Sequence, residues 1–231
     1  MNIEILELLE GARRARGLTV IIDVFRAFSL EAYLFSRGAS RIYAVGDEET
    51  ARRLKSENPD VLLVGERGGK ILPGFDYGNS PWQTEGAPLK GKTVVHTTSS
   101  GTQGLAAASG ARQLLAASLV TSSATARYIA SQAPQQVSLV AMGWAGQRTT
   151  PEALLCARAI EASLQGTSLN MADEIDALRR TAEGAKFFNS QTQDVFPRED
   201  FALCTAVDRF DFCIAARKIS DDVFAMTPLR R

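Results

Sequence analysis

Histidine and cysteine are scarce in this chain of 231 residues, which has one histidine and three cysteines. A single histidine excludes a zinc site built from several histidines and gives little support to a serine–histidine hydrolase. Cys156, Cys204 and Cys213 are odd in number and lie in apolar surroundings, so we expect reduced, buried thiols in a cytoplasmic protein. None of them has an arginine six residues later, which excludes the cysteine-nucleophile phosphatase pattern.

Net charge, long apolar runs and nucleotide motifs are also missing. The 26 basic and 26 acidic side chains cancel, so no nucleic-acid partner is expected. No run of about 18 apolar residues occurs, and Met1–Glu4 lacks a signal pattern, so no membrane partner is expected either. The phosphate-binding loop of nucleotide triphosphatases, the dinucleotide fingerprint and the paired aspartates of haloacid dehalogenases are absent. The chemistry that remains uses carboxylates, arginines and a hard cation such as Mg²⁺.

Strand-like and helix-like patterns alternate along the chain. Strands are expected over residues 18–24, 41–45, 61–64, 93–97, 113–117, 137–142 and 212–216, and helices over 27–36, 48–57, 102–109, 124–131, 152–164 and 170–183. This alternation predicts one α/β domain over residues 1–231, a three-layer α/β/α arrangement with a mostly parallel or mixed sheet. Ligands of such sheets bind at the carboxyl ends of the strands.

A glycine-rich loop follows the strand expected at 61–64. Five glycines and two prolines lie between Gly65 and Pro81, together with Glu66, Arg67, Asp76, Asn79 and Ser80. Glycine lets backbone N–H groups approach an anion closely, arginine offers a planar fork for phosphate or sulfonate, and carboxylates hold hard cations. We interpret the loop as an anion site.

Three other strand ends carry polar residues. Asp23 lies at the end of the first strand and Arg26 follows it, a hydroxyl-rich turn at 97–102 leads into a helix, and Gly143–Arg148 follows a later strand. Convergence of these ends predicts one site. Structural alternatives stay open: Asp23, Thr98 and Ser100 as helix caps, Glu66–Arg67 as a surface pair, Asp76 and Asn79 as turn residues, Glu152 in a capping box, and His96 as a structural histidine.

Several motifs resemble those of the 2-phosphosulfolactate phosphatase family, a Mg²⁺-dependent group linked to coenzyme M biosynthesis. They are Asp23–Ser29, Gly65–Gly69 with Gly74–Pro81, Thr97–Thr102, Leu155–Ala157, and Cys204 with Asp208. The resemblance covers residues 18–218. Three positions depart from the family pattern: Ser100 replaces an asparagine, Ala153 replaces an aspartate, and Arg158 replaces a small residue.

The resemblance implies hydrolysis of a phosphate monoester on a small acid, with 2-phospho-3-sulfolactate as first candidate. We expect Asp23, Glu66 and Asp76 to hold Mg²⁺, and Asp23, Arg26 and Arg67 to act in catalysis, with Asp23 as nucleophile or as the residue that positions a water. The expected substrate-binding residues are Asn79, Ser80, Thr98, Ser100, Gly101 and Thr102. Another phosphorylated hydroxy acid as substrate, or a non-catalytic anion-binding protein, are the alternatives. A homodimer is the default for a cytoplasmic enzyme of this size.

Overall fold

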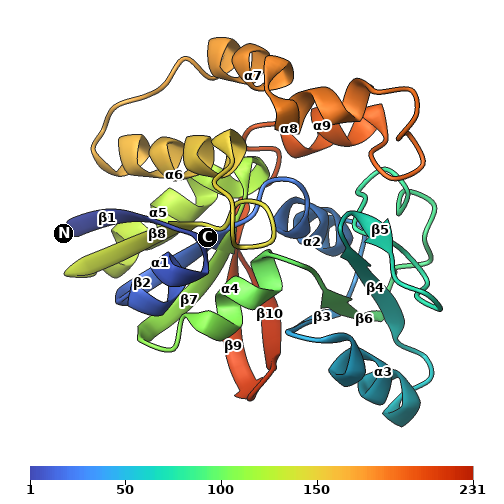
Figure 1. Cartoon of the computed structure of the whole chain (residues 1–231). Helices are drawn as coiled ribbons and strands as arrows, with labels where there is room; N and C mark the ends of the chain where they lie inside the picture. Colours follow the sequence, from blue (N-terminus) through green and yellow to red (C-terminus); the bar gives the residue numbers. More distant parts are fainter. Residues whose placement is uncertain (231) are drawn as a thin grey trace.

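The computed structural model describes residues 1–230 and contains one ten-stranded sheet with helices on both faces (Figure 1). The strands are β1 (Asn2–Glu7), β2 (Gly17–Ile22), β3 (Arg41–Val45), β4 (Leu62–Arg67), β5 (Lys70–Ile71), β6 (Thr93–Thr97), β7 (Ala111–Ala117), β8 (Gln136–Ala141), β9 (Phe212–Ser220) and β10 (Val223–Arg230). The α-helices are α1 (Leu8–Arg14), α2 (Ala27–Ser36), α3 (Glu48–Glu57), α4 (Gly101–Ala107), α5 (Ser122–Gln132), α6 (Pro151–Leu164), α7 (Met171–Arg180), α8 (Ala182–Ala185) and α9 (Arg198–Cys204).

The sheet consists of two parallel blocks that run in opposite directions. The strand order is β1-β8-β2-β7-β9-β10-β3-β6-β4-β5. Strands β1, β8, β2 and β7 are mutually parallel, as are β3, β6 and β4. Between the blocks, the pairs β7–β9, β9–β10 and β10–β3 are all antiparallel, so three reversals separate the blocks. In Figure 1 the first block lies on the left, the second on the right, and the β9–β10 hairpin between them.

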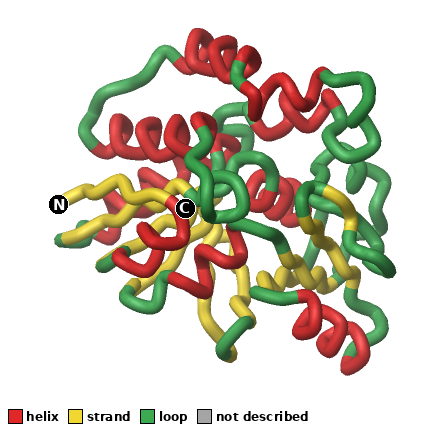
Figure 2. The backbone as a smooth tube through the Cα atoms, in the orientation of Figure 1, coloured by secondary structure: helices red, strands yellow, loops and turns green. Residues whose placement is uncertain are grey.

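Side-chain alternation along the strands divides the core into layers. In β2, Ile21 packs in one buried cluster with residues of α1, α2 and α4, whereas Val20 and Ile22 pack in a second cluster with residues of α5 and α6. A third, smaller cluster joins α3 to β3, β4 and β6. Figure 2 shows the helices on both sides of the strands. The three-layer α/β prediction is confirmed, with a mixed sheet.

Most predicted elements appear within a few residues of their expected ends. Helices α2 and α3 and strands β3 and β6 have the predicted bounds. The helix expected over 170–183 is interrupted at Thr181, whose backbone is extended and whose hydroxyl accepts a hydrogen bond from the Gly184 N–H, so a new helix, α8, begins there. Strands β1, β5 and β10 and helices α1 and α9 were not predicted. No helix within residues 1–230 is long and apolar enough to cross a membrane.

Candidate functional site

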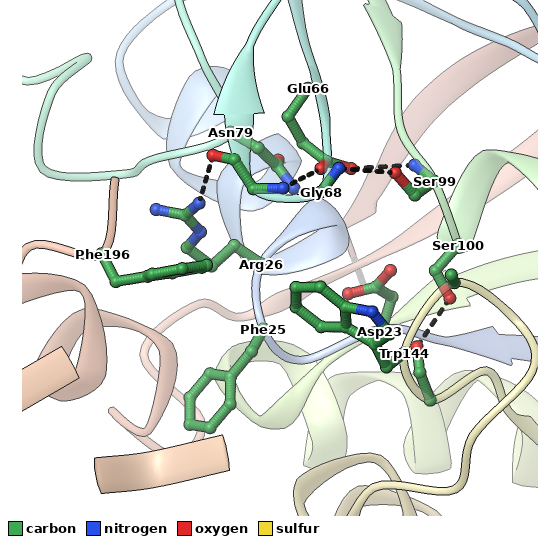
Figure 3. A pocket seen from close by; sticks show the side chains of 13 residues that line it. Asp23, Phe25, Arg26, Glu66, Gly68, Asn79, Ser99, Ser100, Trp144 and Phe196 are labelled. Carbon is green, nitrogen blue, oxygen red and sulfur yellow. Dashed lines mark hydrogen bonds between the residues drawn. The ribbon is translucent and has the colours of Figure 1, made fainter. Parts of the chain in front are cut away.

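A pocket of about 70 Å³, open to solvent, lies where the carboxyl ends of the two blocks meet (Figure 3). The first block contributes the segments after β2 and β8, and the second block contributes the end of β4 and the segment after β6. Phe196, which precedes α9, closes one side. The lining residues are Asp23, Phe25, Arg26, Glu66, Gly68, Gly69, Asn79, Ser99, Ser100, Gly143, Trp144, Ala145 and Phe196.

Asp23 is a buried carboxylate directly after β2. Its Oδ1 accepts a hydrogen bond from the Ala27 N–H at 3.2 Å, and its Oδ2 accepts one from the Gly101 N–H at 2.9 Å. The N-cap of α2 is Arg26, and Asp23 accepts the hydrogen bond of the first N–H of that helix while it lines the pocket. Burial, with a smaller contribution from the nearby carboxylate of Glu66, raises the pKa of Asp23 from 3.8 to about 6.

Glu66 is a second buried carboxylate in the same pocket, near the end of β4. Its Oε1 accepts a hydrogen bond from the Ser99 N–H at 2.8 Å, and its Oε2 accepts one from the Gly69 N–H at 2.6 Å. Gly69 has a φ of +86° and an added Cβ would lie 2.5 Å from the Phe196 ring, so this contact requires glycine. Glu66 therefore belongs to the site and does not form a surface pair with Arg67.

Arg26 lines the pocket, but its charge is balanced by Asp200. Its Nη1 donates to Asp200 Oδ2 and to the Val195 carbonyl, both at 2.8 Å, and its Nη2 donates to the Gly69 carbonyl at 3.2 Å. Both side chains of the ion pair are buried. Asp200 also accepts hydrogen bonds from the Ser80 hydroxyl and the Trp82 N–H, each at 2.9 Å. The pair ties α9 to the glycine-rich loop.

Asn79 lines the pocket and is held from behind by His96. The Asn79 Oδ1 lies 3.2 Å from His96 Nε2, and His96 Nδ1 lies 2.9 Å from Glu31 Oε1. All three side chains are buried. The structural interpretation of His96 fits this geometry, because its ring contacts Asn79 and Glu31 and does not line the pocket.

The other predicted substrate-binding residues divide into two groups. Ser100 lines the pocket, and its hydroxyl donates to the Gly143 carbonyl at 2.8 Å, which links the two blocks. Gly101 uses its N–H on Asp23, and Thr102 donates its hydroxyl to the Thr98 carbonyl, so these residues build the turn around the pocket and do not line it. Ser80 lies behind the pocket against Asp200.

Arg67 and Asp76, predicted to act in catalysis and to bind the metal, also lie outside the pocket. Side chains alternate along a strand, so Arg67 points away from Glu66, and its guanidinium donates to the Thr97 hydroxyl and the Glu66 carbonyl. Asp76 accepts a hydrogen bond from the Leu63 N–H at 2.7 Å. Leu63 lies three residues before Glu66 on β4, about 10 Å along the strand, which separates Asp76 from the other two carboxylates.

Aromatic rings form one wall of the pocket, with an ionic cluster behind them. The ammonium of Lys186 lies 4.6 Å from the centre of the Trp144 ring and 4.9 Å from that of Phe196, and pairs with Glu183 at 2.7 Å. Asp200, Phe196 and Lys186 were not predicted to lie at the site. Nearby, the capping box predicted for Glu152 does not form, because Thr150 is the N-cap of α6 and makes no side-chain cap bond.

The donor set of the pocket suits a hard cation that keeps most of its waters. Within residues 1–230 no group of three or more histidine, cysteine, aspartate or glutamate side chains is arranged to hold a metal ion. Asp23 and Glu66, however, line one pocket as two like-charged buried carboxylates. Mg²⁺ is commonly bound by one or two carboxylates together with substrate phosphate and water. Two carboxylates next to a phosphate-sized hollow fit that pattern, and Asp76 is not part of it.

Comparisons with known proteins agree on one family. A family model described as 2-phosphosulpholactate phosphatase matches residues 3–218. The probable 2-phosphosulfolactate phosphatase of Gloeobacter violaceus is 33% identical over 203 residues, 82% of this chain and 84% of that protein. Those of Bacillus subtilis and Deinococcus radiodurans are 28% and 38% identical, over 87% and 56% of this chain and 87% and 55% of their own lengths. The chain belongs to the 2-phosphosulfolactate phosphatase family.

Proposed function

We propose that this chain is a Mg²⁺-dependent phosphatase that hydrolyses the phosphate monoester of 2-phospho-3-sulfolactate to 3-sulfolactate and phosphate. The observation that carries the proposal is the charge of the pocket. Asp200 balances Arg26, so the carboxylates of Asp23 and Glu66 are left without a counter-charge. An anionic substrate enters such a pocket only together with a cation. The names of the relatives supply the candidate substrate.

Asp23 and Glu66 are the residues that would hold Mg²⁺. Each of their four oxygens accepts one backbone N–H, which fixes both carboxylates and leaves a further lone pair on each oxygen. A bound Mg²⁺ would neutralise phosphoryl charge in the transition state. Burial and, to a smaller extent, the charge of Glu66 raise the pKa of Asp23, and a dication beside both carboxylates would favour the charged form.

The remaining groups of the pocket would orient the substrate. Gly68 has a φ of +60° and nothing within 4 Å of an added Cβ, so its backbone borders open space beside Glu66. Gly68 and Ser99 approach each other across the pocket entrance, with the Gly68 N–H 3.4 Å from the Ser99 hydroxyl. Trp144 and Phe196 exclude water from one side, which strengthens the electrostatic interactions inside.

The test is phosphate release from a panel of small phosphorylated acids, with 2-phospho-3-sulfolactate included, in Mg²⁺ and in EDTA. We expect release that requires Mg²⁺, and we expect Asp23→Asn and Glu66→Gln each to lower turnover about a hundredfold or more. Arg53→Gln, an exposed residue of α3, is the matched control and should leave turnover unchanged. Release that persists in EDTA would contradict the metal requirement. A folded protein that binds these acids without releasing phosphate would make it an anion-binding protein.

A further inference from the structure

A chain of hydrogen bonds connects the buried core to the pocket through Glu31, His96 and Asn79. Glu31 on α2 and His96 on β6 are fully buried, and Asn79 lines the pocket. The distances are 2.9 Å from Glu31 Oε1 to His96 Nδ1 and 3.2 Å from His96 Nε2 to Asn79 Oδ1. The proposed reaction gives neither Glu31 nor His96 a role, although burying such groups is costly unless they are paired. This arrangement therefore calls for an explanation of its own.

The positions of the protons in these hydrogen bonds decide which end of the Asn79 amide faces the pocket. One proton lies between His96 Nδ1 and Glu31, on the nitrogen or on the carboxyl group. In either case His96 Nε2 faces the oxygen of Asn79, and it forms a hydrogen bond only if it carries a proton. With its oxygen held by His96, Asn79 turns its NH₂ group away from the ring. The NH₂ group then presents two N–H donors of fixed direction to the pocket.

One further observation favours this orientation over the reversed amide. Asp23 and Glu66 line the same pocket and are already acceptors. A third acceptor there would repel both a phosphoryl group and its neighbours, whereas an NH₂ group complements an anion.

We propose that His96, held by Glu31, is a positioning residue that fixes the Asn79 amide so that its NH₂ group donates to a phosphoryl oxygen of the substrate. The proposal rests on the proposed function, since it names a donor for that reaction. The donor is neutral and is aimed before the substrate arrives. Preorganised donors of this kind stabilise charge that develops in a transition state without further rearrangement.

The first test uses the fact that His96 is the only histidine of the chain. Protein labelled with ¹⁵N-histidine gives the ring signals of one residue, and a proton-coupled nitrogen spectrum shows which nitrogen carries hydrogen. We expect a proton on Nε2, both in free protein and with inorganic phosphate added. An unprotonated Nε2 would overturn the proposal, because Asn79 would then present its oxygen to the pocket. The spectrum requires no enzymatic activity, so its outcome is separate from that of the proposed function.

The second test removes Glu31 and His96, together called the relay, without leaving a buried charge. Replacing both partners by apolar residues, Glu31→Leu with His96→Phe, avoids the cost of an unpaired carboxylate. We expect kcat/KM for 2-phospho-3-sulfolactate to fall about tenfold or more in this double variant and about a hundredfold in Asn79→Ala. In the Asn79→Ala background, the relay substitutions should add less than about twofold, because the group they position is gone.

The matched control for this cycle is Thr125→Val, a fully buried hydroxyl on α5 that donates to the Thr121 carbonyl far from the relay. Its effect on kcat/KM should be the same with and without Asn79. If the relay substitutions lower kcat/KM by the same factor in both backgrounds, their role is structural and the positioning proposal is wrong. If wild-type protein hydrolyses no phosphate ester, the proposed function fails and the nitrogen spectrum alone decides the orientation of Asn79.

Discussion

The buried ion pair between Arg26 and Asp200 gives the most direct test of how this site is built. The substitution is Asp200→Asn, which keeps the shape of the side chain and removes its charge. Asp200 has no exposed surface and accepts three hydrogen bonds, from Arg26 Nη1 at 2.8 Å and from the Ser80 hydroxyl and the Trp82 N–H at 2.9 Å each. An asparagine has one oxygen for these donors and turns an NH₂ group toward at least one of them.

The expected loss of free energy of unfolding follows from the charge of Arg26, which remains in the variant. Arg26 would stay buried with no charged partner, beside the carbonyls of Val195 and Gly69 and the ring of Phe196. Breaking a buried pair in this way costs about 3–5 kcal/mol, against a total free energy of unfolding of roughly 5–15 kcal/mol for a domain. The pair Arg26→Met and Asp200→Asn completes a double-mutant cycle, and the double variant should lose less than the two single variants together, by about 2 kcal/mol or more.

Urea unfolding followed by circular dichroism measures these free energies. Glu57→Gln is the control, because Glu57 forms a comparable carboxylate–guanidinium pair with Arg53 on the exposed surface of α3, where the expected change is within roughly 0.5 kcal/mol. A loss below about 1 kcal/mol for Asp200→Asn, or a coupling near zero in the cycle, would refute the argument that Asp200 is the counter-charge of Arg26. Arg26 would then be available as the counter-charge of Asp23 and Glu66 in the pocket.

Three other predictions concern stability and the residues around the site. Burial raises the pKa of Glu152 from 4.5 to about 7, so its contribution to stability is complete below pH 4.5 and is lost as pH rises to 7. Urea unfolding at pH 4.5 and pH 8 should show this loss in the free energy of unfolding, on the order of 3 kcal/mol, in wild-type protein. The loss should be absent in Glu152→Gln. Gly104→Ala places a Cβ 2.5 Å from Met142 Sδ and should destabilise by about 1–3 kcal/mol, whereas Gly86→Ala, with open space around it, should not; equal thermal shifts would contradict this. Arg67→Ala should lower turnover less than tenfold, because the side chain points away from the pocket, and a hundredfold loss would return Arg67 to the catalytic set.

The local elements of the fold could be predicted because their signals are local. Short apolar runs mark strands such as Arg41–Val45, and α3 begins after Asp47, whose side chain accepts from the Thr50 N–H. The direction of the strands could not be predicted in the same way. It depends on the β9–β10 hairpin, whose second strand was not predicted and which reverses the sheet between the two blocks.

At the site, too, residues marked by a local pattern could be predicted, whereas contacts between residues far apart in the sequence could not. Asp23, Glu66 and Ser100, which line the pocket, could be singled out from the sequence because each lies near the end of a predicted strand, where ligands bind in α/β sheets. Asp200 was not predicted, because Arg198-Glu199-Asp200 has the composition of a solvated, charged helix start. Its partner Arg26 lies 174 residues earlier, so no local pattern indicates the pair. Asp76 lies outside the pocket, where it accepts from the Leu63 N–H and pairs with Lys55 at 3.7 Å; the sequence alone does not distinguish such a turn residue from a metal ligand.

The hydrogen bonds of the two acids explain why the pocket requires both blocks. Asp23 follows β2 of the first block but accepts from the N–H of Gly101, which follows β6 of the second. Ser100 of the second block donates to Gly143 of the first. These hydrogen bonds join the segments that follow the carboxyl ends of the two blocks. The two carboxylates thus line a pocket to which both blocks contribute, at the free-energy cost that burial of Asp23 and, to a smaller extent, the charge of Glu66 impose, and a bound cation is the group that would offset it.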